Sequence, residues 1–204
     1  MPVINDIEVQ EPVPVVTNNY SGTLVILGGA RCVWEDFKNF KELIGPRKYA
    51  IMAINDIGIQ IRRDIDHMVS LHWQFLPAAK LLKPVNAHGH FHTHGDKHHD
   101  GVDFVWPIEN VGGTSAMYAC KVAILLGYTK IVICGVPLDG SGHYFDPPDA
   151  EPDNHFNDYA HKHVWAQFKD NTESARNRIR SFSGSTRDTF GLPTEVWLNS
   201  NEVI

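Results

Sequence analysis

The chain has 204 residues, of which 43 % are hydrophobic and 21 % are charged, and its formal net charge is −6. This size and balance suit one globular domain and exclude a disordered chain. No apolar run approaches the roughly 20 residues of a membrane helix. The N-terminal residues also lack the basic and apolar blocks of a secretory signal. The acidic balance argues against nucleic-acid binding by the whole surface.

The cysteines indicate the compartment. Cys32, Cys120 and Cys134 are too dispersed for a zinc ribbon or a disulfide framework, so a reducing, cytoplasmic environment is expected. Cys32 follows a glycine turn with no adjacent base. We therefore predict a buried structural thiol there rather than a nucleophile.

Apolar runs and helical patterns alternate along the first half of the chain. Residues 1–20 contain three prolines and predict an extended arm, followed by one domain over 21–204. The spacing then predicts strands over 23–29, 49–55, 67–72 and 103–107. It predicts helices over 34–44 and, after a break at Pro77, over the residues up to 83.

The clearest unit is a helix followed by a strand. Thr114 or Ser115 can cap a helix that runs to Leu126, and Gly127 is a suitable C-terminal stop. The next residues, 130–136, are apolar on both faces, which is typical of a strand in a parallel sheet covered on both sides. The pattern predicts an α/β, Rossmann-like, doubly wound and mainly parallel sheet with helices on both faces.

The C-terminal third has a different texture. Residues 140–156 are rich in glycine, proline and aspartate, and they predict a lid around 140–165. A helix is predicted from about 159 to 180, and residues 193–198 are a candidate edge strand.

In an open parallel sheet, ligands bind beyond the carboxyl ends of the strands. That rule selects the residues that follow the predicted strands and open the capped helix. They are Gly28, Gly29, Ala30, Asn55, Asp56, His72, Thr114, Ser115, Gly135 and Asp139. We expect these ten residues to share one crevice and to bind a nucleotide.

Each group has a chemical reason and a plainer alternative. Gly28 and Gly29 allow backbone N–H groups to approach a ligand, although many such turns use glycine only for packing. The start of the capped helix is a natural anion site or an ordinary cap. Asn55 can hydrogen-bond a base or sugar edge, and Asp56 is a carboxylate or an N-cap.

Six of the twelve histidines fall between His88 and His99. In an extended segment His88, His90, His92 and His94 would share a face and could bind a transition metal. The segment is also similar to the HxHxDH motif of metallo-β-lactamase-fold hydrolases, but Lys97 stands where the last histidine belongs. We expect a solvated, flexible histidine-rich loop and assign no metal site.

Four arginines are concentrated near the C-terminal end. Arg176, Arg178, Arg180 and Arg187 could face a phosphate or a carboxylate, or could simply form a solvated face. Arg187 lies in a polar stretch that could loop back toward the crevice.

From Thr114 to Asp139 the chain resembles bacterial sialyltransferases of the Campylobacter lipooligosaccharide type. It also resembles the wider set with the same core, including 6-hydroxymethylpterin diphosphokinases and flagellin glycosyltransferase-like proteins. The matching positions are Thr114, Ser115, Gly127, Tyr128, Gly135 and Asp139. Residues 23–32 and 52–56 resemble the family's first two strands. The ending, 180–194, resembles uncharacterised phage-encoded members.

The resemblance implies a glycosyltransferase that uses a CMP-sugar or related donor, with no obligatory metal. It implies that Asn55 and Ser115 hold the nucleotide and that a lid histidine acts as acid or base. His161 and His155 are the candidates for that lid histidine. Related enzymes associate, so the resemblance also suggests a homo-oligomer. Departures are Gly29-Ala30-Arg31-Cys32 for the family's Asn-Gly-Pro-Ser and Ala116 for a glycine.

Three other functions remain open from the sequence. A pyrophosphoryl transferase using ATP and magnesium would take Asp56 and Asp139 as metal ligands. A non-enzymatic protein would sequester a nucleotide, for instance for a phage in its host. A metal-dependent hydrolase would use the histidine cluster, and we rank it last.

Overall fold

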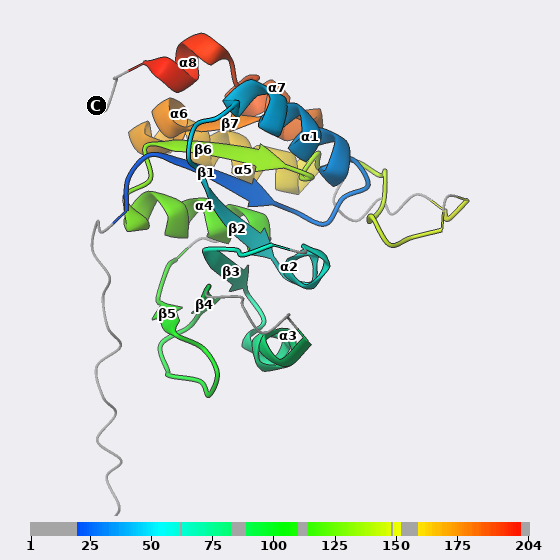
Figure 1. The fold of residues 1–204 in the computed structure, drawn as a ribbon, viewed down its shortest axis with the longest axis vertical. Helices are drawn as coiled ribbons and strands as arrows, with labels where there is room; N and C mark the ends of the chain where they lie inside the picture. Colours follow the sequence, from blue (N-terminus) through cyan, green and yellow to red (C-terminus); the bar gives the residue numbers. More distant parts are fainter. Residues whose placement is uncertain are drawn as a thin grey trace, which may run out of the picture.

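A computed structural model describes residues 20–61, 63–82, 89–109, 114–147, 149–151 and 159–200. Seven parallel strands form one sheet in the order β5-β4-β3-β2-β1-β6-β7 (Figure 1). The strands are β1 (Thr23–Leu27), β2 (Ala50–Ile54), β3 (His67–Ser70), β4 (His90–His94), β5 (Phe104–Trp106), β6 (Lys130–Cys134) and β7 (Ile179–Ser181). This is the α/β, Rossmann-like architecture that the apolar alternation predicts.

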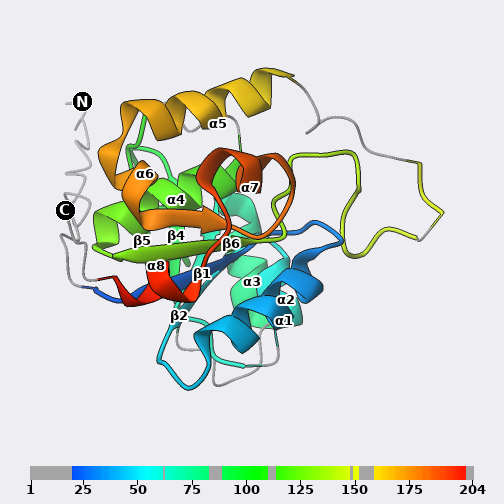
Figure 2. The same ribbon diagram turned by 90° about the horizontal axis from the view of Figure 1, so that it is seen from above.

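Helices cover both faces of the sheet (Figure 2). One layer holds α1 (Val33–Ile44), α2 (Ile57–Gln60), α3 (Leu76–Leu82) and α8 (Glu195–Asn199). The other holds α4 (Ser115–Leu126), α5 (Tyr159–Asn171), α6 (Glu173–Arg178) and α7 (Gly184–Phe190). A short 3-10 turn, η1 (Trp73–Phe75), leads into α3. Each layer packs its own apolar core against the sheet, which explains why β1, β2 and β6 are apolar on both faces.

The capped unit forms as the sequence predicts. The Thr114 hydroxyl accepts a hydrogen bond from the Met117 N–H at 3.2 Å, so Thr114 is the N-cap of α4. Gly127 ends the helix with φ +101°, a conformation that glycine adopts without a Cβ penalty. The break predicted at Pro77 is not seen, because Pro77 is the second residue of α3. In the first turn of a helix its missing N–H costs nothing.

Two predictions for the C-terminal region are wrong. The single helix expected over 159–180 is interrupted at Thr172, and its last part is the edge strand β7. Strand β7 has only three residues and is paired with β6. So short an apolar pattern does not distinguish a strand from the end of a helix. Residues 193–198 are not a strand, because Thr194 caps α8 by accepting from the Trp197 N–H at 3.2 Å.

The expectation of a solvated, flexible histidine loop is also wrong for residues 90–94, which form β4. His92 is fully buried and accepts a hydrogen bond at Nδ1 from the Trp106 Nε1–H at 3.1 Å. Its Nε2 lies 3.0 Å from Nδ1 of His67, whose Nε2 lies 2.8 Å from the Tyr128 hydroxyl. Cross-strand partners therefore satisfy imidazoles that look solvated in the sequence.

The arm predicted for residues 1–20 lies outside the described residues except for Tyr20. Tyr20 stacks on Tyr128 at 5.4 Å between ring centroids. Within the described ranges, none of the helices is both long and apolar enough to cross a membrane.

Candidate functional site

The order in which strands are added to the sheet switches sides between β1 and β6, while all strands stay parallel. Strands β1 to β5 follow one another outward from β1, whereas β6 and β7 lie on its other side. A cavity of about 630 Å³ opens at the carboxyl ends of β1, β2, β3 and β6, beside this switch point. This is the place where open parallel sheets bind ligands.

All ten residues selected from the sequence line this cavity. They are Gly28, Gly29, Ala30, Asn55, Asp56, His72, Thr114, Ser115, Gly135 and Asp139. Parallel strands bring their carboxyl ends to one edge, so strand pairing by itself gathers Gly28, Asn55 and Gly135. The lining also contains residues that the sequence did not select, above all His143 and an apolar wall from η1 and α3.

The glycine turn after β1 serves packing more than ligand approach. The Gly28 N–H donates to the Cys134 carbonyl at 2.8 Å, and the Ala30 N–H donates to the Gly135 carbonyl at 3.1 Å. A Cβ on Gly28 would lie 2.5 Å from the Gly135 oxygen. Gly28 therefore lets β1 and β6 approach each other, whereas a Cβ on Gly29 would make only an ordinary contact with the His143 ring at 3.5 Å. The expectation that the Gly28 N–H is open to a ligand is wrong, because this group donates to the Cys134 carbonyl.

Asn55 carries the most informative geometry in the cavity. It sits at φ +54°, in the left-handed region, directly after β2. Its backbone N–H donates to the Val69 carbonyl at 3.0 Å, which holds it in place. Its side-chain Oδ1 is buried and accepts no hydrogen bond from the described residues. A buried acceptor without a donor costs about 1–3 kcal/mol, so this oxygen is suited to a donor from a ligand.

The second strained residue lies in the same cavity. Leu138, at φ +52°, is the other non-glycine residue with positive φ within the described ranges. A leucine has no side-chain polar group to ease that conformation, which costs about 1–3 kcal/mol. Backbone strain of this kind collects at functional sites, where the surrounding structure enforces it.

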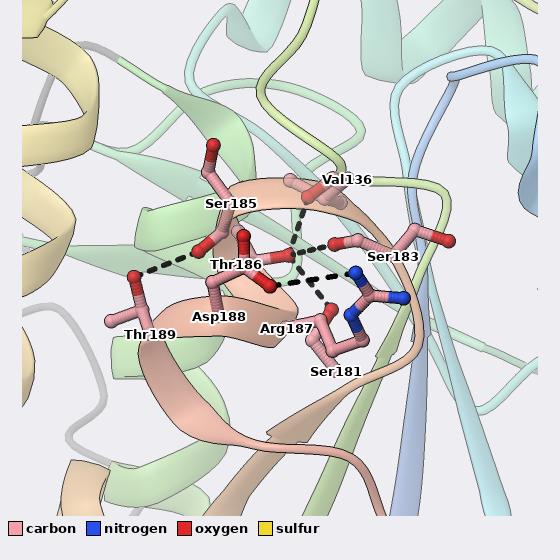
Figure 3. A network of polar contacts seen from close by, with 8 residues as sticks. All are labelled: Val136, Ser181, Ser183, Ser185, Thr186, Arg187, Asp188 and Thr189. Carbon is pink, nitrogen blue, oxygen red and sulfur yellow. Dashed lines mark hydrogen bonds and ion pairs between the residues drawn. The ribbon is translucent and has the colours of Figure 1, made fainter.

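A polar segment behind the cavity enforces the strained loop. The Thr186 hydroxyl donates to the Val136 carbonyl at 2.6 Å and lies 2.7 Å from the Ser181 hydroxyl (Figure 3). The Ser185 N–H donates to the Pro137 carbonyl at 2.7 Å. These bonds fix the backbone immediately before Leu138. The segment therefore lies behind the crevice and supports it through hydroxyl and backbone groups, but none of its residues, Arg187 included, lines the cavity.

The start of α4 forms another wall. The Ser115 hydroxyl accepts from the Leu71 N–H at 3.3 Å and so ties the end of β3 to the helix. Because Thr114 already caps Met117, the N–H groups of Ser115 and Ala116 are the first-turn donors next to the cavity. A helix start of this kind favours an anion.

A loop after β6 contributes to the lining of the cavity. Its Tyr144 N–H donates to the Gly29 carbonyl at 2.9 Å, and the Tyr144 hydroxyl donates to Asp56 Oδ2 at 3.1 Å. Burial, and next the Asp56 carboxylate, raise the pKa of Tyr144 to about 12. Asp139 accepts from the Ser141 N–H at 3.0 Å. The predicted lid therefore begins as a loop attached to the ends of β1 and β2.

The histidine in this loop is His143, which lines the cavity. Its Nδ1 lies 3.7 Å from Asp146 Oδ2, and its ring stacks on Phe145 at 5.1 Å. The expected His161 lies instead in the first turn of α5 and does not line the cavity, and His155 lies outside the described residues. Only the fold shows which histidine of the lid region reaches the strand ends.

The four C-terminal arginines do not line the cavity. Arg178 donates to the Tyr128 carbonyl at 3.5 Å, and Arg187 pairs with Asp188 at 3.4 Å. Arg176 donates to the Asp170 carbonyl, and Arg180 lies in β7, where it donates to carbonyls and covers Trp197. In this structure they serve helix ends and surface pairs.

The cysteines are free thiols, and burial raises the pKa of Cys32 to about 11. A thiol that stays protonated at neutral pH is a poor nucleophile, as expected for Cys32, although this residue is only partly buried and not fully buried as predicted. Among the described residues, no group of three or more histidine, cysteine or carboxylate side chains is placed to hold a metal ion.

Neither a scan against protein-family models nor searches of curated proteins and of solved structures gave a match for this chain.

Proposed function

We propose that the cavity binds a nucleotide-activated sugar, a CMP-sugar or a related donor, and that the protein is a glycosyltransferase. The observation that carries the proposal is Asn55. A strained residue with a buried amide oxygen that lacks a donor, beside the switch point of a parallel sheet, suits the N–H or O–H edge of a nucleoside. The resemblance between residues 114–139 and sialyltransferases supports the choice of donor.

The residues of the cavity suggest how the donor would be held. The Ser115 and Ala116 N–H groups, at the positive end of α4, would bind the phosphate. No metal is required for that contact. The Asn55 amide would bind the nucleoside, and the lid loop would cover the reacting end.

His143 is the cavity histidine best placed for proton transfer. Asp146 lies near Nδ1, and in the proposed reaction Nε2 would take a proton from an acceptor hydroxyl. The hydroxyl oxygen would then bond to the anomeric carbon of the sugar. The bond from that carbon to the phosphate oxygen would break, and the electron pair would leave with the nucleoside monophosphate. We assign this role to His143 in place of His161.

The binding test compares wild type with Asn55→Gly by thermal shift, over a panel of nucleotides and nucleotide sugars with and without magnesium. Glycine adopts φ +54° without strain, so the variant should be at least as stable as wild type. CMP or a CMP-sugar should raise the Tm of wild type by mass action, independently of magnesium, and should not raise that of the variant. An equal shift in both proteins would refute the role of Asn55.

The turnover test measures nucleotide release from the donor that binds. His143→Ala should lower the rate about 100-fold or more, whereas His161→Ala, outside the cavity, should leave it unchanged. Loss of activity in His161→Ala alone would restore the role expected from the sequence. Tight binding with full recovery of unaltered donor would favour a sequestering protein.

The alternative of ATP-dependent pyrophosphoryl transfer uses the two carboxylates of the cavity. Asp56 already accepts from Tyr144 and Asp139 from Ser141, so both would need to release a loop contact to bind magnesium. A thermal shift seen only with ATP and magnesium together would favour this alternative.

A further inference from the structure

The cavity has two chemically different walls. The polar wall comes from Asn55, the start of α4 and the residues after β6. The other wall comes from η1 and α3 and is apolar, with Phe75, Leu76 and Leu82 among its residues. Phosphate and sugar hydroxyls have their partners on the first wall, so the second wall needs an apolar surface of the ligand.

Exposed rings belong to both walls of the cavity. Phe75 is 62 % exposed and Phe145 is 59 % exposed, although both line the cavity. Leu82, 66 % exposed, adds to the same rim. Large apolar groups left in water around a cavity mark a surface that a ligand covers.

The two rings come from elements on opposite sides of the cavity. Phe75 follows β3, and Phe145 follows β6, the two outer strands of the four that border the cavity. The Tyr144 hydroxyl bond to Asp56 carries the lid across β1 to the end of β2, and Phe145 is the next residue. The Phe145 ring thus lines the same cavity as Phe75, from the opposite border.

Each ring also has an aromatic neighbour that stiffens it. Phe145 stacks on His143 with 14° between the ring planes, and Phe75 meets His72 edge to face at 6.0 Å. Flat, supported rings favour a flat ring as their occupant over a flexible acyl chain. Aromatic side chains bind nucleobases in this way without regard to sequence.

We propose that Phe75 and Phe145 form an aromatic clamp that stacks the base of the nucleotide, while the phosphate binds at the start of α4. This assignment rests on the proposed function and adds the orientation of the donor. The base lies between Phe75 and Phe145, and the sugar and phosphate extend from there toward the start of α4. The lid then senses the nucleotide, because one half of the clamp belongs to it.

Isothermal titration of CMP and of ribose 5-phosphate, which lacks the base, tests the clamp. Phe75→Ala and Phe145→Ala should each weaken CMP binding about tenfold or more and leave ribose 5-phosphate unaffected. Phe75→Leu keeps apolar area but removes the ring, so it should weaken CMP in the same way. Leu192→Ala, a change at an exposed leucine away from the cavity, is the matched control.

The outcomes separate the clamp from the function. If CMP binds wild type and both phenylalanine variants equally, the clamp is refuted and the nucleotide site stands. If neither CMP nor any of the other three nucleoside monophosphates binds wild type, both proposals fail. If decanoate binds wild type, and its affinity is lowered by Phe75→Ala but not by Phe75→Leu, the rim is an acyl site and the clamp is refuted.

Discussion

Acidification should unfold this protein through its buried histidines. An indole N–H only donates, so Trp106 fixes the His92 proton on Nε2. That proton is donated to His67, which must then keep its own proton on Nε2 and donate to Tyr128. The three hydrogen bonds from Trp106 to Tyr128 thus all run in the same direction. Adding one proton to either ring would place two donors face to face.

The magnitude follows from linkage. Burial lowers the pKa of His67 to about 3 and that of His92 well below its usual value. Unfolded histidines titrate near 6.5, so the unfolded state binds more protons between pH 6.5 and about 3. The stability is fully present above pH 6.5 and is lost as the pH falls. At pH 5 the loss is about 2 kcal/mol per histidine, or about 4 kcal/mol for the pair.

The assay is urea unfolding at pH 7 and pH 5, followed by tryptophan fluorescence. His92→Gln keeps an acceptor for Trp106 and a donor for His67 but cannot titrate, so its loss should fall to about 2 kcal/mol. His98→Gln, at an exposed position, should keep the full wild-type loss. A wild-type loss below about 1 kcal/mol would refute the buried neutral pair.

Three further outcomes follow from the loop supports and the thiols. Gly184→Ala should cost about 3 kcal/mol in urea unfolding, because its φ is +56° and a Cβ would lie 2.3 Å from the Pro137 oxygen. Ser183→Ala removes a donor 2.5 Å from the buried Asp36 carboxylate and should cost about 1–3 kcal/mol. Burial raises the pKa of Cys32 to about 11, so Ellman's reagent at pH 8 should label no thiol quickly in the folded protein and three in urea.

Much of the candidate site could be predicted because it depends on strand ends. Apolar runs predict β1, β2 and β6. Parallel pairing then places Gly28, Asn55 and Gly135 at one edge, whatever the lengths and sequences of the connections between these strands. Thr114 and Gly127 act through local backbone geometry, so their roles in α4 are also visible in the sequence. That these residues bind a nucleotide stays a prediction.

The remaining features depend on partners distant in sequence. Strand β7 exists only because Ile179 and its neighbours pair with β6. His92 appears polar and solvated until Trp106 and His67 are placed around it. The strain at Asn55 and the position of His143 likewise arise from contacts with other strands.

The sequence by itself therefore determined the parallel sheet, the capped helix and the edge at which the cavity opens, because hydrophobic periodicity and capping act over a few residues. Only the tertiary structure decided which histidine reaches the cavity, which histidines are buried and where the apolar wall lies. Burial and hydrogen-bond partners are set by segments that meet only after folding.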